Sequence, residues 1–161
     1  ATWNVFVDGN YAYMASGGPG IQIINISDPA SPKLTGSYNT PGRDSDVFIS
    51  GGYAYVTDEY VTSKTTGLQI LNISNPSNPT LTGSYNIAPK DANSVFVSGN
   101  YAFMADDDGL RVLDVTDPAN PILAGLKSIT YGFRDVYVSG SYVYVTSGAL
   151  GLLIFDVSGL P

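Results

Sequence analysis

Short stretches of alternating apolar and polar residues recur along this chain, and turn residues separate them. The first clear example is Val5–Ala15, in which Val-Phe-Val and Tyr-Ala-Tyr flank Asp-Gly-Asn. Glycine supplies the positive φ angle that tight hairpin turns need, so this pattern predicts a β-hairpin. No window places apolar residues at helical spacing over several turns. The pattern therefore predicts an all-β protein.

The hairpin pattern occurs four times. Its copies begin at Val5, Val47, Val95 and Val136, which are 42, 48 and 41 residues apart. A glycine and a run rich in Ile, Leu and Val follow each copy, and we interpret this run as a largely buried third strand. The four runs are Gly20–Ser27, Gly67–Ser74, Gly109–Thr116 and Gly151–Ser158.

Paired prolines and a short apolar stretch follow three of the four runs. Proline cannot donate to a sheet ladder, so each pair ends the third strand and leads to an outer fourth strand. These segments are Asp28–Tyr38, Asn75–Tyr85 and Asp117–Lys127, whereas the fourth copy breaks off at Gly159–Pro161.

A four-stranded meander repeated at just over forty residues is typical of a β-propeller blade. A barrel or sandwich is the alternative, but the repeated occurrence of the same three segments in one order favours the propeller. We predict one repeat domain with blades at 1–40, 41–89, 90–130 and 131–161, the last without its outer strand.

The third-strand segments resemble a known repeat. Ile21–Pro29, Leu68–Pro76 and Leu110–Pro118, each joined to a Val-x-Val-Ser-Gly-Asn-Tyr-Ala-Tyr type hairpin, are similar to LVIVD repeats. This resemblance implies a propeller in a bacterial or archaeal protein that is exported or displayed at the cell surface. The repeat itself has no enzymatic motif, so the resemblance implies a surface scaffold or interaction module.

Composition narrows the chemistry. The 161 residues contain no Cys and no His, which excludes Ser-His-Asp or Cys-His catalysis, His- or Cys-ligated zinc and iron–sulfur clusters. The net charge of −7 comes with no basic stripe, so we expect no nucleic-acid partner. No apolar run approaches the ~20 residues of a membrane span. A surface of Ser, Thr, Asn, Tyr and Asp with few Lys is typical of exported prokaryotic proteins.

Asp106, Asp107 and Asp108 form the most acidic turn of the chain. Their carboxylates could hold Ca²⁺, which prefers oxygen ligands, although the spacing is not that of an EF-hand. The alternative is a solvated acidic turn, because loops often collect Asp for turn chemistry. We therefore expect no obligatory cofactor and keep calcium as a candidate.

Polar residues also gather at the start of each inner strand, where a propeller places them near its axis. They are Asn4, Asp44, Asp46, Asp91 and Asp135, with Asn93 and Ser94 beside Asp91. A cation or ordered waters could lie among them, and a hydrated channel mouth is the simpler interpretation. Glycoside hydrolysis needs an acid and a base, but no pair stands out by its spacing. We predict that the chain is not an enzyme.

Asp58 and Glu59 occupy the loop of the second repeat that is equivalent to the acidic turn at 106–108, and an insertion running through 60–66 makes it the longest such loop. Binding surfaces are often built on inserted loops, so it is a candidate contact region, and drift of a neutral loop is the alternative.

Asn25 and Asn72 match the N-glycosylation sequon. Asp114 and Asp156 occupy the same repeat position, which favours a different role. We expect these side chains to cap the following turn by hydrogen bonds to the backbone.

The hairpin aromatic residues alternate around Ala or Val, so we expect one set to pack between blades and the other against the next layer, and we assign both sets to the core. They are Tyr11, Tyr13, Tyr53, Tyr55, Tyr101, Phe103, Tyr142 and Tyr144.

The missing outer strand predicts an exposed, apolar edge on the fourth blade. We assign Gly151, Leu152, Ile154 and Asp156 to this edge. Two chains could share such edges in an eight-bladed ring, a surface array or a filament, or the chain could be an excerpt of a longer propeller. We predict a non-enzymatic exported scaffold that self-associates. The alternative is a propeller module that binds calcium or carbohydrate.

Overall fold

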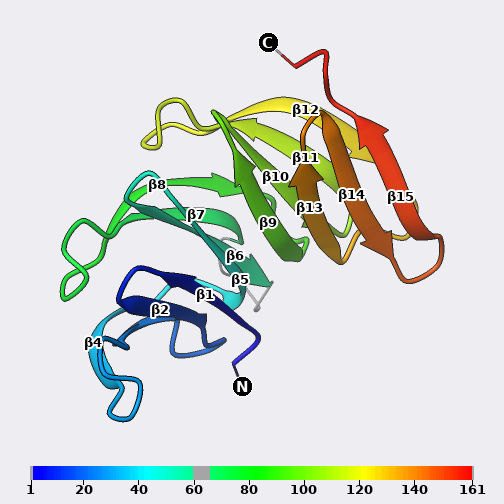
Figure 1. Ribbon diagram of the computed structural model, residues 1–161. Helices are drawn as coiled ribbons and strands as arrows, with labels where there is room; N and C mark the ends of the chain where they lie inside the picture. The colour runs from blue at the N-terminus through cyan, green and yellow to red at the C-terminus, as the bar shows by residue number, and fades with distance from the viewer. Residues whose placement is uncertain (1, 60–65, 161) are drawn as a thin grey trace.

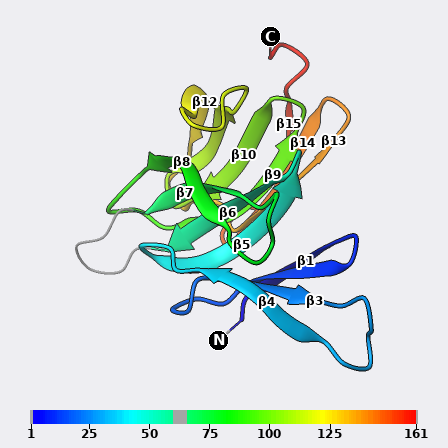
Figure 2. The same cartoon turned by 90° about the vertical axis from the view of Figure 1, so that its left-hand side faces the viewer.

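The computed structural model describes residues 2–59 and 66–160 (Figure 1). Within these residues the chain forms fifteen β-strands in four antiparallel sheets. The sheets follow one another as a fan of blades, and each sheet corresponds to one predicted repeat (Figures 1 and 2). The predicted all-β, propeller-type fold is confirmed. The described residues include no helix that is long and apolar enough to cross a membrane.

We number the blades in chain order. The first contains β1 (Asn4–Asp8), β2 (Tyr11–Ala15), β3 (Ile21–Asn25) and β4 (Lys33–Tyr38). The second contains β5 (Arg43–Ser50), β6 (Tyr53–Glu59), β7 (Gly67–Asn72) and β8 (Thr80–Asn86). The third contains β9 (Ala92–Ser98), β10 (Tyr101–Asp106), β11 (Gly109–Asp114) and β12 (Ile122–Ser128). The fourth contains β13 (Asp135–Ser139), β14 (Tyr142–Ser147) and β15 (Gly151–Asp156), so its described sheet has three strands, as predicted.

Hydrogen-bonded neighbours in each sheet are also neighbours in sequence, which makes every blade a meander. The first hairpin pairs Asp8 with Tyr11 across a turn in which Gly9 has a φ of 55°. The three complete blades also share a register shift between their third and fourth strands, after Ile23, Ile70 and Val112. The sequence repeat is therefore accompanied by a repeat in backbone geometry.

The alternation of side chains gives each blade two faces. We call the face turned toward the preceding blade the backward face and the face turned toward the following blade the forward face. The hydrophobic core lies between blades, where a forward face meets a backward face. Tyr13 and Ile23 of the first blade pack in this way with Val47 and Val56 of the second.

The other two junctions use equivalent positions. Leu68 and Ile70 of the second blade pack with Val95 and Met104 of the third. The third and fourth blades are joined by a core that includes Phe103, Leu110, Val112, Val136, Val138 and Val145. The fold therefore contains three copies of one inter-blade interface.

Aromatic rings on the first strand of each blade form a continuous ladder. Phe6 and Phe48 have ring centroids 5.0 Å apart, Phe48 and Phe96 are 4.6 Å apart, and Phe96 and Tyr137 are 5.0 Å apart. Such tilted pairs stabilise a junction beyond the apolar area that they bury. The ladder ends at Phe6 and at Tyr137, one ring in each end blade.

Candidate interaction surface

The backward face of the first blade is exposed. Val5 and Val7 are 56% and 58% exposed, whereas their equivalents in the second blade, Val47 and Ile49, are buried. The residue types are alike, so the difference arises from the neighbour: in the described chain no blade covers this face. Trp3 is also exposed here, and a hollow of about 450 Å³ is lined by Thr2, Trp3, Asn4 and Val5.

The forward face of the fourth blade is exposed in the same way. Leu152 and Ile154 are 62% and 54% exposed, whereas Leu110 and Val112 in the third blade are buried. These side chains belong to the predicted edge of Gly151, Leu152, Ile154 and Asp156, all of which lie on β15. The structure thus exposes the face of β15 that bears Leu152 and Ile154, as well as its edge.

The absence of a neighbouring blade in the described chain also exposes one residue that was predicted to lie in the core. Tyr11, Tyr53 and Tyr101 pack against the inter-blade cores. Tyr142 occupies the equivalent position and is 48% exposed, so its assignment to the core is wrong. The reason is that its ring points out of the last forward face.

Three polar side chains at the starts of the inner strands meet across two junctions. Ser94 Oγ lies 2.8 Å from Asp46 Oδ2 and 2.9 Å from Asp135 Oδ1. Asp46 Oδ2 also accepts a hydrogen bond from the backbone N–H of Val95, in the next blade, at 2.9 Å. Burial raises the pKa of Asp46, and these hydrogen bonds oppose that rise. The structure therefore brings Asp46 and Asp135 together through Ser94.

The other residues predicted for the channel mouth have different surroundings. Asn4 is exposed at the start of β1. The backbone N–H of Asp91 lies 3.4 Å from Asp107 Oδ2. Asp44 is fully buried and its Oδ1 accepts a hydrogen bond from the Thr40 hydroxyl.

Asp44 faces a second buried acid that sequence reasoning placed in a loop. Asp58 belongs to β6, is fully buried and pairs with Asp44 in the β5–β6 register. Burial raises the pKa of Asp58 to about 8, and the nearby Asp44 carboxylate adds to the rise. Burial also raises the pKa of Asp44 to about 6, opposed by the Thr40 hydroxyl. The pair therefore holds about one proton at neutral pH.

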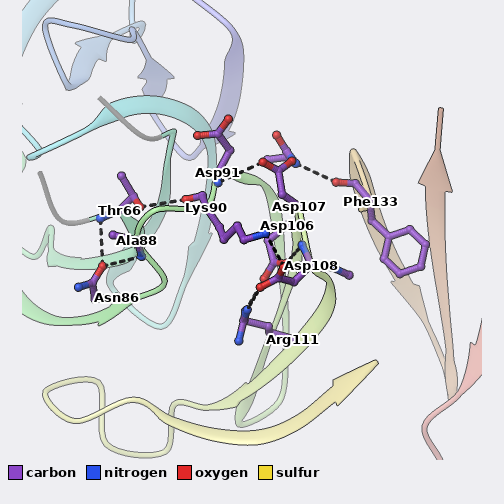
Figure 3. A network of polar contacts seen from close by, with 12 residues as sticks. Thr66, Asn86, Ala88, Lys90, Asp91, Asp106, Asp107, Asp108, Arg111 and Phe133 are labelled. Atoms are coloured by element: carbon purple, nitrogen blue, oxygen red, sulfur yellow. Dashed lines mark hydrogen bonds and ion pairs between the residues drawn. The ribbon is translucent and has the colours of Figure 1, made fainter. Parts of the chain in front are cut away.

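The acidic turn is an ion-pair network (Figure 3). Asp106 is fully buried, and its Oδ2 lies 2.5 Å from Arg111 Nε. Asp108 contacts both Arg111 Nη2 and Lys90 Nζ at 2.9 Å. Asp107 Oδ1 lies 3.5 Å from Arg134 Nη1. Calcium at these three carboxylates would compete with cationic side chains that already contact them.

The described residues contain no group of three or more acidic side chains arranged to hold a metal ion. The inserted segment of the second blade, predicted as a contact region, lies at 60–65 outside the described residues; only Thr66 is described.

The residues of the two sequons form turn caps. Asn25 Oδ1 and Asn72 Oδ1 each accept a hydrogen bond from the backbone N–H two residues later, at 2.9 Å. Asp114 and Asp156 make the same contact in their blades. The predicted capping role is confirmed in all four blades.

These features define a β-propeller repeat protein whose two end faces are free in the described chain. The model of the LVIVD repeat matches residues 1–40, 41–87, 89–126 and 133–160. The chain therefore belongs to the LVIVD repeat family. A search of curated proteins found no match.

Solved structures share the fold at low sequence identity. The computationally designed Ika4 protein is 9% identical with a TM-score of 0.77, over 98% of this chain and 92% of Ika4. The designed Ika8 protein is 10% identical with a TM-score of 0.77, over 100% of this chain and 47% of Ika8. The chain thus spans about half of Ika8. PorZ of Porphyromonas gingivalis, a bacterial surface component of a type-IX secretion system, is 14% identical with a TM-score of 0.54, over 97% of this chain and 21% of PorZ.

Proposed function

We propose that this chain is a non-enzymatic, exported propeller that acts as a structural and protein-interaction scaffold and associates with itself through its end blades. The two exposed end faces carry the proposal. They are the two halves of the interface that already joins the blades three times within the chain. An exposed apolar patch of this kind marks an interaction site.

Two further observations support the remaining parts of the proposal. The acids of the turn at 106–108 contact Arg111, Lys90 and Arg134, an arrangement that suits a structural role. A composition rich in Ser, Thr, Asn and Tyr suits an exported protein, and the fold is shared with PorZ, which its name places at a bacterial surface.

Charge on either end face tests the self-association. We expect the wild-type chain to exceed the monomer mass in light scattering at micromolar concentration. Val7→Asp and Ile154→Asp should each lower the mass toward that of a monomer, because burying an unpaired carboxylate in an apolar interface is costly.

Leu34→Asp is the matched control. Leu34 is as exposed as Ile154, but it lies on the outer strand β4. This variant should associate like the wild type. A wild-type chain that is monomeric throughout the micromolar range would contradict the proposal.

A further inference from the structure

A polar contact joins the second and third blades, and in the described fourth blade the equivalent acid makes only part of this contact. Asp46 Oδ1 accepts the N–H of Val47 in its own blade, and Oδ2 accepts the N–H of Val95 and lies near Ser94 Oγ in the next blade. Asp135 is the equivalent residue of the fourth blade. Its Oδ1 accepts the N–H of Val136 and lies near Ser94 Oγ, and no hydrogen bond from a described residue reaches its Oδ2.

The complementary group is exposed in the first blade. Val5 is equivalent to Val95, and Asn4 is equivalent to Ser94. In an antiparallel pair, alternate N–H groups of an inner strand point away from the ladder, and Val95 shows that this position points toward the preceding blade. The N–H of Val5 and the side chain of Asn4 therefore offer donors where Asp135 Oδ2 offers an acceptor.

The aromatic ladder and the apolar residues of the two end faces support the same alignment of the fourth blade with a first blade. Tyr137 ends the ladder at one end and Phe6 begins it at the other. Leu152 and Ile154 are equivalent to Leu68 and Ile70, which pack with Val95 and Val97 inside the chain. Val5 and Val7 are equivalent to Val95 and Val97, and both are exposed. Hydrogen-bonding, aromatic and aliphatic positions therefore match in one alignment.

Resting on the proposed self-association, we infer that the partner is a second copy of this chain and that two copies close a ring of eight blades. In this ring Asp135 of each copy accepts from the Val5 N–H and the Asn4 amide of the other, and Tyr137 stacks on Phe6.

Closure by two copies follows from the shape of the fan. The blades turn in one direction, with β1, β5, β9 and β13 on the inner side, and the fan is open between the first and fourth blades (Figure 1). The same four blades superpose on 47% of Ika8, so this blade-to-blade geometry also occurs in a chain about twice as long. A head-to-tail contact closes into a ring when its rotation allows, and closure by two copies leaves no free face.

A disulfide test is direct because the chain has no cysteine. We would oxidise the double variant Asn4→Cys/Asp135→Cys and run it on a denaturing gel without reductant. The expected product is one covalent dimer that reduction returns to monomer. The double variant Asp46→Cys/Ser94→Cys calibrates the reaction inside one chain, and Asn10→Cys/Asp135→Cys is the negative control, because Asn10 is exposed at the far end of β1.

Each other outcome overturns the inference in a different way. A ladder of larger covalent species indicates a filament, and a cross-linked monomer indicates that one chain closes its own ring. Absence of a cross-link while light scattering still shows a dimer means that self-association stands and this register is wrong. Monomers in light scattering would contradict the proposed function itself.

A second variant keeps the test informative if the cysteines disturb folding. Asp135→Ala should raise the dissociation constant of the dimer by about tenfold or more, since an interfacial hydrogen bond to a charged group is lost. Asp8→Ala, an exposed acid on the same hairpin turn as Asn10, should leave it unchanged. Equal dissociation constants for Asp135→Ala and the wild type would contradict the assigned role of Asp135.

Discussion

Two buried acids at equivalent positions, Asp58 and Asp106, are accommodated by different chemistry. Asp106 pairs with Arg111 on the neighbouring strand, which offsets the rise in its pKa that burial causes. In the second blade Gln69 stands where the third has Arg111, and among residues 2–59 and 66–160 no cationic side chain forms an ion pair with Asp58. Burial and the nearby Asp44 carboxylate hold the pKa of Asp58 at about 8, so its carboxyl group remains protonated at neutral pH.

The Asp44–Asp58 pair should make stability fall as pH rises. The folded pKa values, about 6 and about 8, lie above the ordinary value near 4, so the folded state binds more protons than the unfolded state between pH 4 and pH 8. The free energy of unfolding contributed by the pair is therefore lost across this window. Asp58→Asn keeps a donor toward Asp44 without the charge. It should equal the wild type near pH 4 and exceed it by about 2 kcal/mol or more at pH 9.

Urea unfolding at a series of pH values measures this difference. Asp8→Asn removes an exposed acid and should shift stability by less than about 0.5 kcal/mol at every pH. A difference between Asp58→Asn and the wild type that does not grow with pH would show that the pair does not retain its proton.

Removal of the Arg111 cation beside Asp106 should strongly lower the free energy of unfolding. Arg111→Met leaves a fully buried carboxylate without its partner, so we expect a loss of about 3 kcal/mol in the free energy of unfolding. Lys90→Met breaks a partly exposed pair with Asp108 and should cost much less than Arg111→Met, because solvent screens an exposed ion pair. Adding Asp106→Asn to Arg111→Met should recover part of the loss, and equal effects of the two single variants in urea unfolding would refute the distinction.

At the scale of strands, the glycine that begins each third strand is required only where an outer strand is present. A Cβ on Gly109, which has a φ of 140°, would lie 2.0 Å from the carbonyl oxygen of Lys127 on β12. Gly67 meets Tyr85 in the same way. A Cβ on Gly151 would meet no described atom within 4 Å, because the described fourth blade has no strand beside β15.

Gly109→Ala and Gly151→Ala form a matched pair. The first should cost about 3 kcal/mol or more, since β11 and β12 must separate to admit the methyl group. The second should cost about 1 kcal/mol, from the positive φ alone. Thermal unfolding of the two variants compares these costs, and a larger loss for Gly151→Ala would show that an outer strand covers β15.

Sequence patterns located the strands better than they located the strand ends. Alternation and turn residues predicted all four hairpins, and the proline pairs predicted where the third strands stop. Asp58 and Asp106 were placed in loops, whereas β6 and β10 run through them. An acid usually marks a turn, whereas here the segments that connect the blades pack over both positions: Gly42 lies against Asp58, and the N–H of Phe133 donates to the carbonyl oxygen of Asp106.

At the scale of the molecule, we expect association through the free end faces to make stability depend on protein concentration. Binding that occurs only in the folded state raises the melting temperature by mass action. The melting temperature of the wild type should therefore rise with protein concentration from nanomolar to micromolar. That of the double variant Val7→Asp/Ile154→Asp should not, and that of Leu34→Asp should follow the wild type. Differential scanning fluorimetry over a dilution series gives this comparison, and a concentration-independent wild type would contradict association through these faces.

The sequence by itself determined the number of blades, the meander in each of them and the face on which each side chain lies, because these depend on local periodicity and turn chemistry. The tertiary structure decided which faces are covered. Val5 and Val47 have the same pattern around them, yet one is exposed and the other buried. Tyr142 and Asp135 likewise acquired their surroundings from the presence or absence of a neighbouring blade, and Asp58 from the segment that connects the first two blades. Periodicity specifies which residues share a face, whereas only the arrangement of blades in space specifies what packs against it.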